Sequence, residues 1–436
     1  MTINITQAGD VDFKEISLIN AAGIGVDISG MVINIDIFES VMNPFMTGSL
    51  LITDSVNFFS TFPIIGEERL NISFETPDTG YRITKQFFVD KLEMRMADNN
   101  MSSYILHFTS IFVLKDLNMK HSSAYSGYGH VITQKLFDKV NQSYPQTTLG
   151  IYTEQTANKL KFISNFWSPF KCITYCANQS ISSKDSTRSP TFLFYEDNKK
   201  FNFRTISDIV DMSTPSASGR TFYYDAINGR GEASTGTQQA LMNVYETILN
   251  LRFVNGFDYI GRHEIGAIQK RVVEFDILRK SINTRLYDYI TEYNNADHVG
   301  KFPASSNQLI YNRINSTVDH TNLWTHAHDG IGVDYRGDVL CRRLGMLANL
   351  DYMSLELEIH GRTDLVVGDV IDLRLQNFAS AIHGTTQEDD KLDALWSGHY
   401  MITEMQHRLS VNRHKIIMRV SKDGVNKSLT FRPRDE

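Results

Sequence analysis

Apolar and polar residues alternate with a period of two near the start of the chain. The isoleucines Ile33, Ile35 and Ile37 are separated by single polar residues, and residues 70–75 repeat the pattern. Because successive side chains of a strand point to opposite faces, each run predicts a half-buried strand. With turn residues between such runs, segment 1–112 is predicted to form a mostly antiparallel β unit, a small tube-like barrel.

A helical period follows this unit. Residues 130–140 place apolar side chains on one helical face. A second helix is expected after Ser168, a good N-cap, because Pro169 is tolerated at the first helical position. Two short aromatic strands within 192–203 complete the prediction of an inserted α+β domain at 113–210.

The middle of the chain is less regular. Segment 211–237 is rich in Gly, Ser and Thr, which predicts a flexible linker or loop. Apolar residues at i, i+3, i+4, i+7 and i+8 then predict an amphipathic helix over 238–251. Alternation at 272–278 predicts a strand. Segment 238–330 is expected to contribute to both the inserted domain and a second barrel.

The pattern is clear again toward the end of the sequence. Residues 340–348 carry an apolar helical stripe, and a strand is predicted at 370–375. A polar insertion at 376–394 separates this strand from a hairpin predicted at 400–421. Segment 331–436 is therefore predicted to be a second tube-like β-barrel domain, and the whole chain a β-rich α+β protein.

The two ends of the chain resemble each other. Gly66 and Gly368 each precede an acidic residue and an alternating strand, and the hairpin predicted at 89–110 parallels the one at 400–421. The match requires a one-residue slip in the first strand and a longer insertion before the second hairpin. It predicts two similar β units in one chain. Three such chains could close a ring of six units with pseudo-sixfold symmetry.

Composition narrows the classes of function. The 436 residues, 42% of them hydrophobic, suggest about three domains with sizeable cores. The 43 Lys and Arg against 50 Asp and Glu give a net charge of −7, which disfavours binding to a nucleic-acid backbone. Three cysteines are too few for a disulfide scaffold. We find no secretory signal and no apolar run long enough to span a membrane.

The best candidate metal ligands are histidines in a polar segment. His320, His326 and His328 lie close together in sequence, with Asp319 and Asp329 beside them. On a strand, His326 and His328 would point to the same side. A His-x-His pair without a third spaced ligand is common by chance, so the pattern favours an exposed polar loop. We assign no metal-ligating residue.

Other reactive residue types also have simpler explanations. Cys172 and Cys176 are four apart on a predicted helix, which is typical of two buried small side chains. Glu196 and Asp197 are predicted to lie on a solvated hairpin turn. The aromatic strand 192–195 favours core packing over base stacking. The sequence has no P-loop, dinucleotide fingerprint, nucleophile elbow or His-Glu-x-x-His helix. No catalytic or cofactor-binding residue and no cofactor are assigned.

The order of these features resembles the baseplate hub proteins of contractile-tailed bacteriophages, related in fold to the N-terminal part of type VI secretion spike proteins. The order of these motifs extends over about 90% of the chain. The resemblance is carried by four stretches: IDIFES with GSLLITD (35–54), WSPF with FLFYED (167–197), the segment at 238–280 that ends in RVVEFDILRK, and LGMLANLDY with LELEIHG and VGDVI (344–371).

The resemblance implies an architecture and a set of partners. Two tube-like antiparallel β-barrel domains would come from the two ends of the chain, with α+β domains inserted between them. A homotrimer would present six barrels to a sixfold tail tube on one side and hold a trimeric central spike on the other. Baseplate wedge and tape-measure proteins are further candidate partners.

The resemblance also implies a role in the virion. The hub would be a structural, non-enzymatic part of a contractile injection system, located in the tail baseplate and assembled in the host cytoplasm without membrane insertion. DNA would pass through its lumen without specific binding, and an acidic wall would repel phosphate.

Two other functions remain open at this point. The chain could be a virion receptor- or glycan-binding protein that uses the aromatic hairpin within 192–203 as a platform. Less favoured is a peptidoglycan hydrolase acting through a pair of carboxylates, because such a pair is formed in space and cannot be seen in a sequence.

Overall fold

The protein was studied as a computed structural model, and the description covers twelve stretches of the chain. These are residues 8–55, 58–76, 81–96, 102–142, 149–184, 188–213, 220–224, 244–276, 280–304, 315–321, 336–376 and 392–427. Strands dominate, and thirteen of them form one large, mostly antiparallel sheet. The prediction of a β-rich α+β fold is confirmed.

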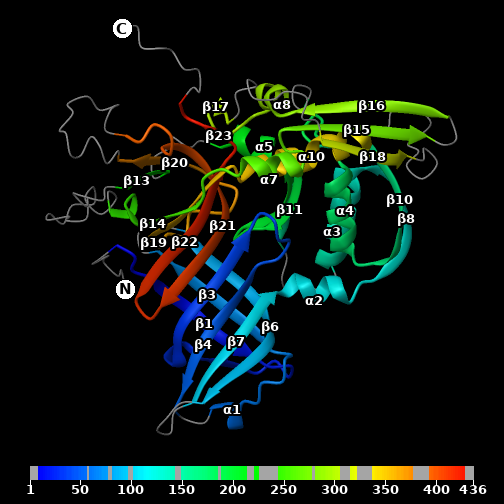
Figure 1. Ribbon diagram of the computed structural model, residues 1–436. Coiled ribbons are helices and arrows are strands. Elements are labelled where there is room, and N and C mark those ends of the chain that lie inside the picture. Colours follow the sequence, from blue (N-terminus) through cyan, green and yellow to red (C-terminus); the bar gives the residue numbers. More distant parts are fainter. Residues whose placement is uncertain are drawn as a thin grey trace, which may run out of the picture.

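The first β unit lies at the bottom of Figure 1 and curls around its own core. Its strands are β1 (Asp12–Ile19), β2 (Gly25–Asp27), β3 (Val32–Ser40), β4 (Thr47–Asp54), β5 (Arg69–Glu75), β6 (Arg82–Met96) and β7 (Ser102–Ser110), with the short helices η1 (Ser29–Met31) and α1 (Phe58–Thr61). They pair in the order β3-β4-β7-β6-β5-β1-β2.

Alternation explains this core with one exception. Ile35 and Ile37 on β3 are buried in the core, as predicted, and so are the alternate residues of β5. Ile33 is 44% exposed, so its predicted place on the buried face is wrong. The register between β3 and β4 shifts between Val32 and Asn34, and this irregularity turns Ile33 out of the core.

The inserted α+β segment follows directly. Its elements are α2 (Ile111–Leu117), β8 (His121–Tyr128), α3 (Gly129–Gln142), β9 (Gly150–Thr153), β10 (Lys159–Trp167), α4 (Pro169–Gln179), β11 (Phe192–Glu196), β12 (Lys200–Thr205) and α5 (Ile206–Asp211). Ser168 caps α4 as predicted, since its hydroxyl accepts a hydrogen bond from the Lys171 N–H at 3.4 Å. The apolar faces of α3, α4, β11 and β12 meet in one core.

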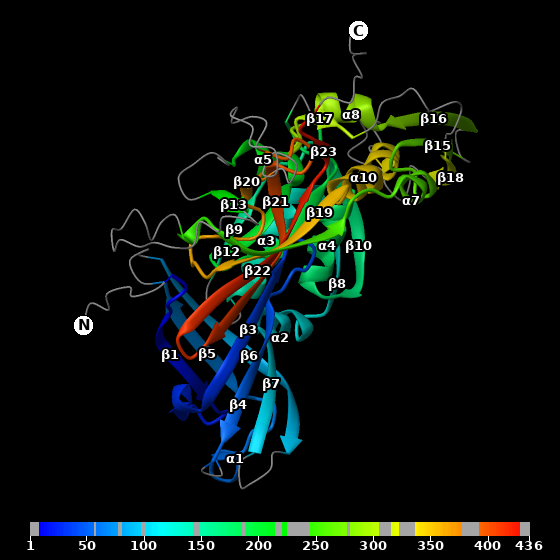
Figure 2. The same ribbon diagram turned by 60° about the vertical axis from the view of Figure 1, so that its left-hand side comes forward.

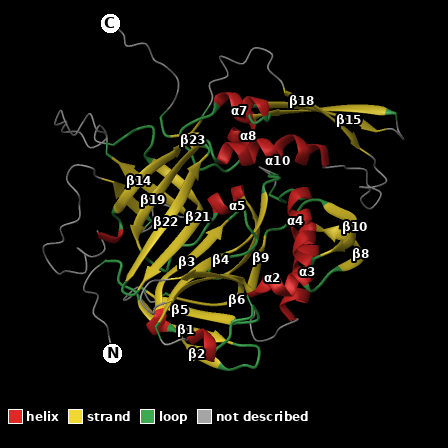
Figure 3. Ribbon diagram, turned by 60° about the horizontal axis from the view of Figure 1, so that its bottom comes forward, coloured by secondary structure: helices red, strands yellow, loops and turns green. Residues whose placement is uncertain are grey.

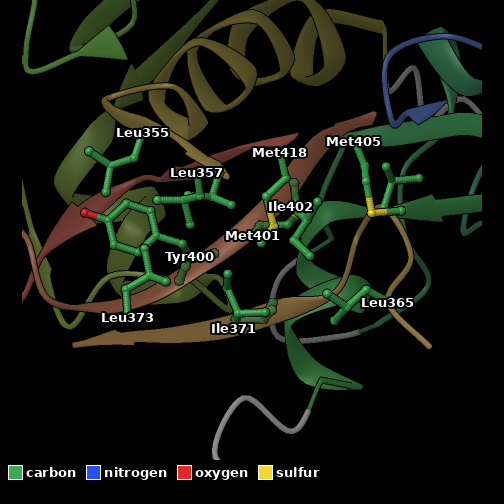
Figure 4. Packing of buried hydrophobic residues seen from close by; sticks show 14 of the residues in the cluster. Leu355, Leu357, Leu365, Ile371, Leu373, Tyr400, Met401, Ile402, Met405 and Met418 are labelled. Atoms are coloured by element: carbon green, nitrogen blue, oxygen red, sulfur yellow. The ribbon is translucent and has the colours of Figure 1, made fainter. Parts of the chain in front are cut away.

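The second β unit comes from the other end of the chain and curls around another core. Its strands are β13 (Thr221–Tyr224), β14 (Ile248–Asn255), β19 (Met353–His360), β20 (Val370–Leu375), β21 (Gly398–Ser410) and β22 (Arg413–Lys422). Figure 4 shows Leu355, Leu357, Ile371, Tyr400 and Met418 packed between these strands. Strands β21 and β22 pair antiparallel, so the hairpin predicted at the end of the chain is confirmed.

Two predictions for the middle of the chain need correction. The helix predicted over 238–251 is wrong at its end, because Ile248 begins β14, an eight-residue strand that pairs antiparallel with β19. Hydrogen bonding to a neighbouring strand outweighs the local helical period there. Strand β13 lies inside the segment predicted to be a linker, and residues 214–219 and 225–243 lie outside the described part. Residues 377–391 of the polar insertion also lie outside it.

A smaller sheet extends from the second unit, as Figure 3 shows. It orders as β16 (Ser281–Asp288), β15 (Gln269–Asp276) and β18 (Asn315–Thr321), with α10 (Arg336–Leu350) packed on one face. The strand predicted near 272 and the helix predicted near 340 are thereby confirmed. Near them lie α7 (Tyr259–Glu264), α8 (Tyr289–Asn295) and the short pair β17 (Phe302–Pro303) and β23 (Gly424–Val425).

The two β units are halves of one continuous sheet. Figures 1 and 2 show β3 of the first unit beside β21 of the second. These strands pair antiparallel from Asn34 to Ser40. The cores also exchange side chains, because Leu409 of β21 is buried in the first core and Val41, just after β3, in the second. The units are therefore joined through a packed seam.

Candidate functional site

The repeat predicted from sequence corresponds to two β units with the same strand pairing. In the first unit the order is β3-β4-β7-β6-β5. In the second it is β14-β19-β22-β21, with β20 on β21 in the place that β5 takes on β6. Each unit thus begins with an antiparallel strand pair, β3-β4 or β14-β19, and ends with a three-stranded antiparallel set. The chain carries the same five-stranded pattern twice.

Both long hairpins contain the same irregularity. The register of β6 on β7 shifts between Val89 and Lys91, and that of β21 on β22 shifts between Ile402 and Glu404. In each case the shift spans one residue of the longer strand, Asp90 in the first unit and Thr403 in the second. A β-bulge of this kind bends a strand and increases its twist. Two bulges at equivalent places give the two units the same curvature.

The loop that leads into β5 in the first unit and into β20 in the second is also repeated. Gly66 and Gly368 have φ angles of +94° and +89°, a conformation that glycine adopts without strain. Next to each glycine, a carboxylate accepts backbone N–H groups of the loop, Glu68 from Ile65 and Gly66, and Asp369 from Val366. The backbone carbonyls of the same two acidic residues also accept hydrogen bonds, each from the N–H group of the residue just before a bulge.

These hydrogen bonds to the two carbonyls show which residues of the two units correspond. The Glu68 carbonyl accepts from the Val89 N–H at 3.0 Å, and the Asp369 carbonyl accepts from the Ile402 N–H at 2.9 Å. Gly66 stands two residues before its acidic partner, whereas Gly368 stands directly before its own. The one-residue slip in the predicted repeat lies at this point, between the glycine and the acidic residue.

A buried polar cluster lies at the seam between the units. The Nδ1 atom of His407 on β21 is 2.9 Å from Nε2 of His414 on β22, and Nε2 of His407 is 3.5 Å from a carboxylate oxygen of Glu39 on β3. All three side chains are almost fully buried. Burial raises the pKa of the Glu39 carboxyl and lowers the pKa of His414 well below its ordinary value.

This cluster predicts a loss of stability in acid. A histidine with a lowered pKa binds its proton more readily in the unfolded chain, so the free energy of unfolding falls as the pH drops below about 6.5. His360, at the end of β19, acts in the same direction, because burial lowers its pKa. The raised pKa of Glu39 has the opposite effect. It lowers the free energy of unfolding as the pH rises above the ordinary carboxyl pKa near 4.5.

Urea unfolding at pH 7 and pH 5 tests this expectation. We expect His414→Gln to reduce the loss of unfolding free energy between these pH values by about 1 kcal/mol or more. His399→Gln, on the same strand as His407 and only half-buried, is the control and should leave the difference unchanged. Equal acid losses in wild type and His414→Gln would contradict this role of the seam.

A buried ion pair joins the inserted segment to the first β unit. Nζ of Lys85 on β6 lies 3.0 Å from a carboxylate oxygen of Glu196 at the end of β11, and it also donates to the Asp197 carbonyl at 2.9 Å. Glu196 and Asp197 are 1% and 4% exposed, so the prediction of a solvated turn is wrong. The turn is covered because β6 presents an ammonium group to it.

The other candidate residues are placed as follows. Cys172 and Cys176 are buried free thiols, as predicted, and burial raises the pKa of both. The aromatic strand β11 is buried in the core. His320 lies on β18, and His326 and His328 lie outside the described residues, so the metal hypothesis stays untested.

Two further features were sought in the described stretches, a cluster of metal-ligating side chains and a membrane-spanning helix. Within them, no group of three His, Cys, Asp or Glu side chains could hold a metal ion. None of the helices in these stretches is long and apolar enough to cross a membrane.

Comparison with known proteins identifies the fold. No family model and no curated protein matches the chain by sequence. The tail protein from Neisseria meningitidis MC58 is similar in structure, with a TM-score of 0.53 and 11% identity over 94% of this chain and 97% of that one. The 43 kDa tail protein of prophage MuSo2 from Shewanella oneidensis has a TM-score of 0.54 and 9% identity over 94% and 98% of the two chains. The chain thus has the fold of these tail proteins, and the predicted resemblance is confirmed at the level of the fold.

Proposed function

We propose that this chain is a structural baseplate hub protein of a phage tail. Three copies would form a ring in which six β units surround a central channel. One side of the ring would meet the sixfold tail tube, and the other would hold a threefold central spike. Wedge and tape-measure proteins are further candidate partners, and the protein would lie in the virion baseplate after assembly in the host cytoplasm.

The observation that carries this proposal is the duplicated unit with its matched bulges. Because both halves have the same strand pairing and matched bulges after Val89 and Ile402, one chain can supply two neighbouring positions of a six-membered ring. A homotrimer has threefold symmetry and, with two similar units per chain, pseudo-sixfold symmetry. The similarity in fold to two tail proteins supports the same role.

A non-enzymatic role agrees with the state of the candidate carboxylates. Glu196 is paired with Lys85 away from solvent, and Asp197 accepts the backbone N–H groups of Lys199 and Lys200 at 2.6 and 2.7 Å. The glycan-binding alternative loses its platform, because the aromatic residues of β11 are buried. DNA would pass through the channel without specific binding, in keeping with the net charge of −7.

Electron microscopy of the purified full chain, alone and with the spike protein of the same virus, tests the proposal. End-on class averages should show a ring with a central hole and six similar lobes arranged as three pairs. Mass measurement should give three chains per ring. Particles of any other symmetry, or monomers that persist when the spike protein is present, would contradict the proposal.

A further inference from the structure

A polar pocket lies where the inserted segment meets the second β unit. Its volume is about 260 Å³, and its walls come from β11, β12, α5 and the loop before β20. Four cationic side chains line it, those of Lys199, Lys200, Arg204 and Arg220. This gathering of positive charge is notable in a chain with a net charge of −7.

The carboxylates of the pocket are already engaged. Nη1 of Arg220 lies 2.6 Å from a carboxylate oxygen of Asp369, and Nε of Arg204 lies 2.9 Å from one of Asp208. Asp197 accepts two backbone N–H groups and, at 2.7 Å, the side-chain amide of Asn202. Asp369 and Asp208 therefore neutralise the two arginines, and the charge of Asp197 offsets one of the two lysines, so these side chains together carry one positive charge in excess.

The two lysines have aromatic neighbours. Nζ of Lys199 lies 5.4 Å from the ring centre of Tyr81, and Nζ of Lys200 lies 4.8 Å from that of Tyr152. No carboxylate of the described residues forms an ion pair with either ammonium group. An aromatic face attracts a cation but leaves its N–H donors available to a ligand.

A buried hydroxyl group also faces this pocket. Tyr195 is 2% exposed, and its oxygen lies beside Gly368, where an added Cβ would approach it to 2.7 Å. The described residues provide no hydrogen-bond partner for this hydroxyl, although a buried tyrosine usually has one. Burial raises the pKa of Tyr195, so the hydroxyl keeps its proton and can donate it.

We propose that this pocket binds a small, multiply charged oxyanion, a phosphate or carboxylate compound free in solution. Lys199 and Lys200 would neutralise its charge, and the Tyr195 hydroxyl would donate a hydrogen bond to one of its oxygens. Lysine is a compact point charge suited to phosphate, and charge-assisted hydrogen bonds are the stronger kind. The site is independent of the proposed hub function and would couple ligand binding to the contact between the inserted segment and β20.

Calorimetric titration of the full chain with pyrophosphate and with citrate, at constant ionic strength, tests the site. Wild type should bind at least one of these anions saturably. The double variant Lys199→Gln/Lys200→Gln should weaken binding more than about tenfold, because it removes two charge-assisted contacts. Tyr195→Phe should weaken it about three- to tenfold, the worth of one neutral hydrogen bond.

The controls separate a specific site from general charge effects. Lys161→Gln removes an exposed lysine from β10 and should leave the dissociation constant unchanged. Circular dichroism should show that all variants are folded. Absence of saturable binding of both anions to wild type would overturn the proposal, as would an unchanged dissociation constant in the double-lysine variant. Binding of citrate without pyrophosphate would assign the site to carboxylates, and the reverse to phosphates.

Discussion

Replacing Ile35 with aspartate is expected to unfold the first β unit or to destabilise it by about 4 kcal/mol or more. The Ile35 side chain is fully buried on β3, opposite Leu50 of β4 and Leu409 of β21. The change removes apolar contacts and places a charge in the apolar core of the first β unit. Since a typical domain is stable by only 5–15 kcal/mol, thermal or urea unfolding should reveal the loss directly.

The same strand offers a matched control. Ile33→Asp introduces the same charge two residues earlier, at a position that is 44% exposed, and should change the unfolding free energy by less than about 1 kcal/mol. If Ile35→Asp cannot be purified, Ile35→Ala should still show a loss of about 2–4 kcal/mol. Equal melting temperatures for Ile33→Asp and Ile35→Asp would show that the face is wrongly assigned.

Local patterns predicted the elements whose residues interact mainly with their own neighbours in sequence. The capped helix after Ser168 depends on a hydrogen bond to Lys171, three residues away. The alternation within 70–75 reflects a single strand with one face against one core. Ile33 and Ile248 were misplaced for the same reason, because the partner strand fixes their surroundings. A strand's register and its bulges depend on that partner, which local periodicity does not identify.

The repeat could be predicted because it is found by comparing two parts of one sequence, without knowledge of which strands pair. Its one-residue slip could be located only with the backbone bonds of Glu68 and Asp369, which show that the units align on the bulge and not on the glycines. The pocket could not be predicted, because the β11–β12 hairpin, which holds Tyr195 and Lys200, meets Asp369 from a loop far along the chain. The only signal in the sequence was the pair Lys199-Lys200 on a hairpin turn.

Replacing Lys85 with methionine is expected to destabilise the protein by about 3–5 kcal/mol. The Lys85 and Glu196 side chains are 6% and 1% exposed, so removal of the ammonium group leaves a buried carboxylate without its countercharge. Lys91→Met, on the same strand but with a side chain 61% exposed, is the matched control and should have little effect. Urea unfolding of both variants and wild type measures the difference.

The double variant distinguishes a buried charge from a lost packing contact. Lys85→Met/Glu196→Gln removes both charges, and a buried ion pair can often be replaced by neutral residues at little net cost. We therefore expect the double variant to regain most of the stability that Lys85→Met loses, although Glu196→Gln adds no apolar contact. If the double variant were as unstable as the single one, the loss would come from the packing of the Lys85 side chain against the β11–β12 turn. Recovery would instead show that the loss in Lys85→Met comes from the uncompensated charge of Glu196, buried where the inserted segment meets the first β unit.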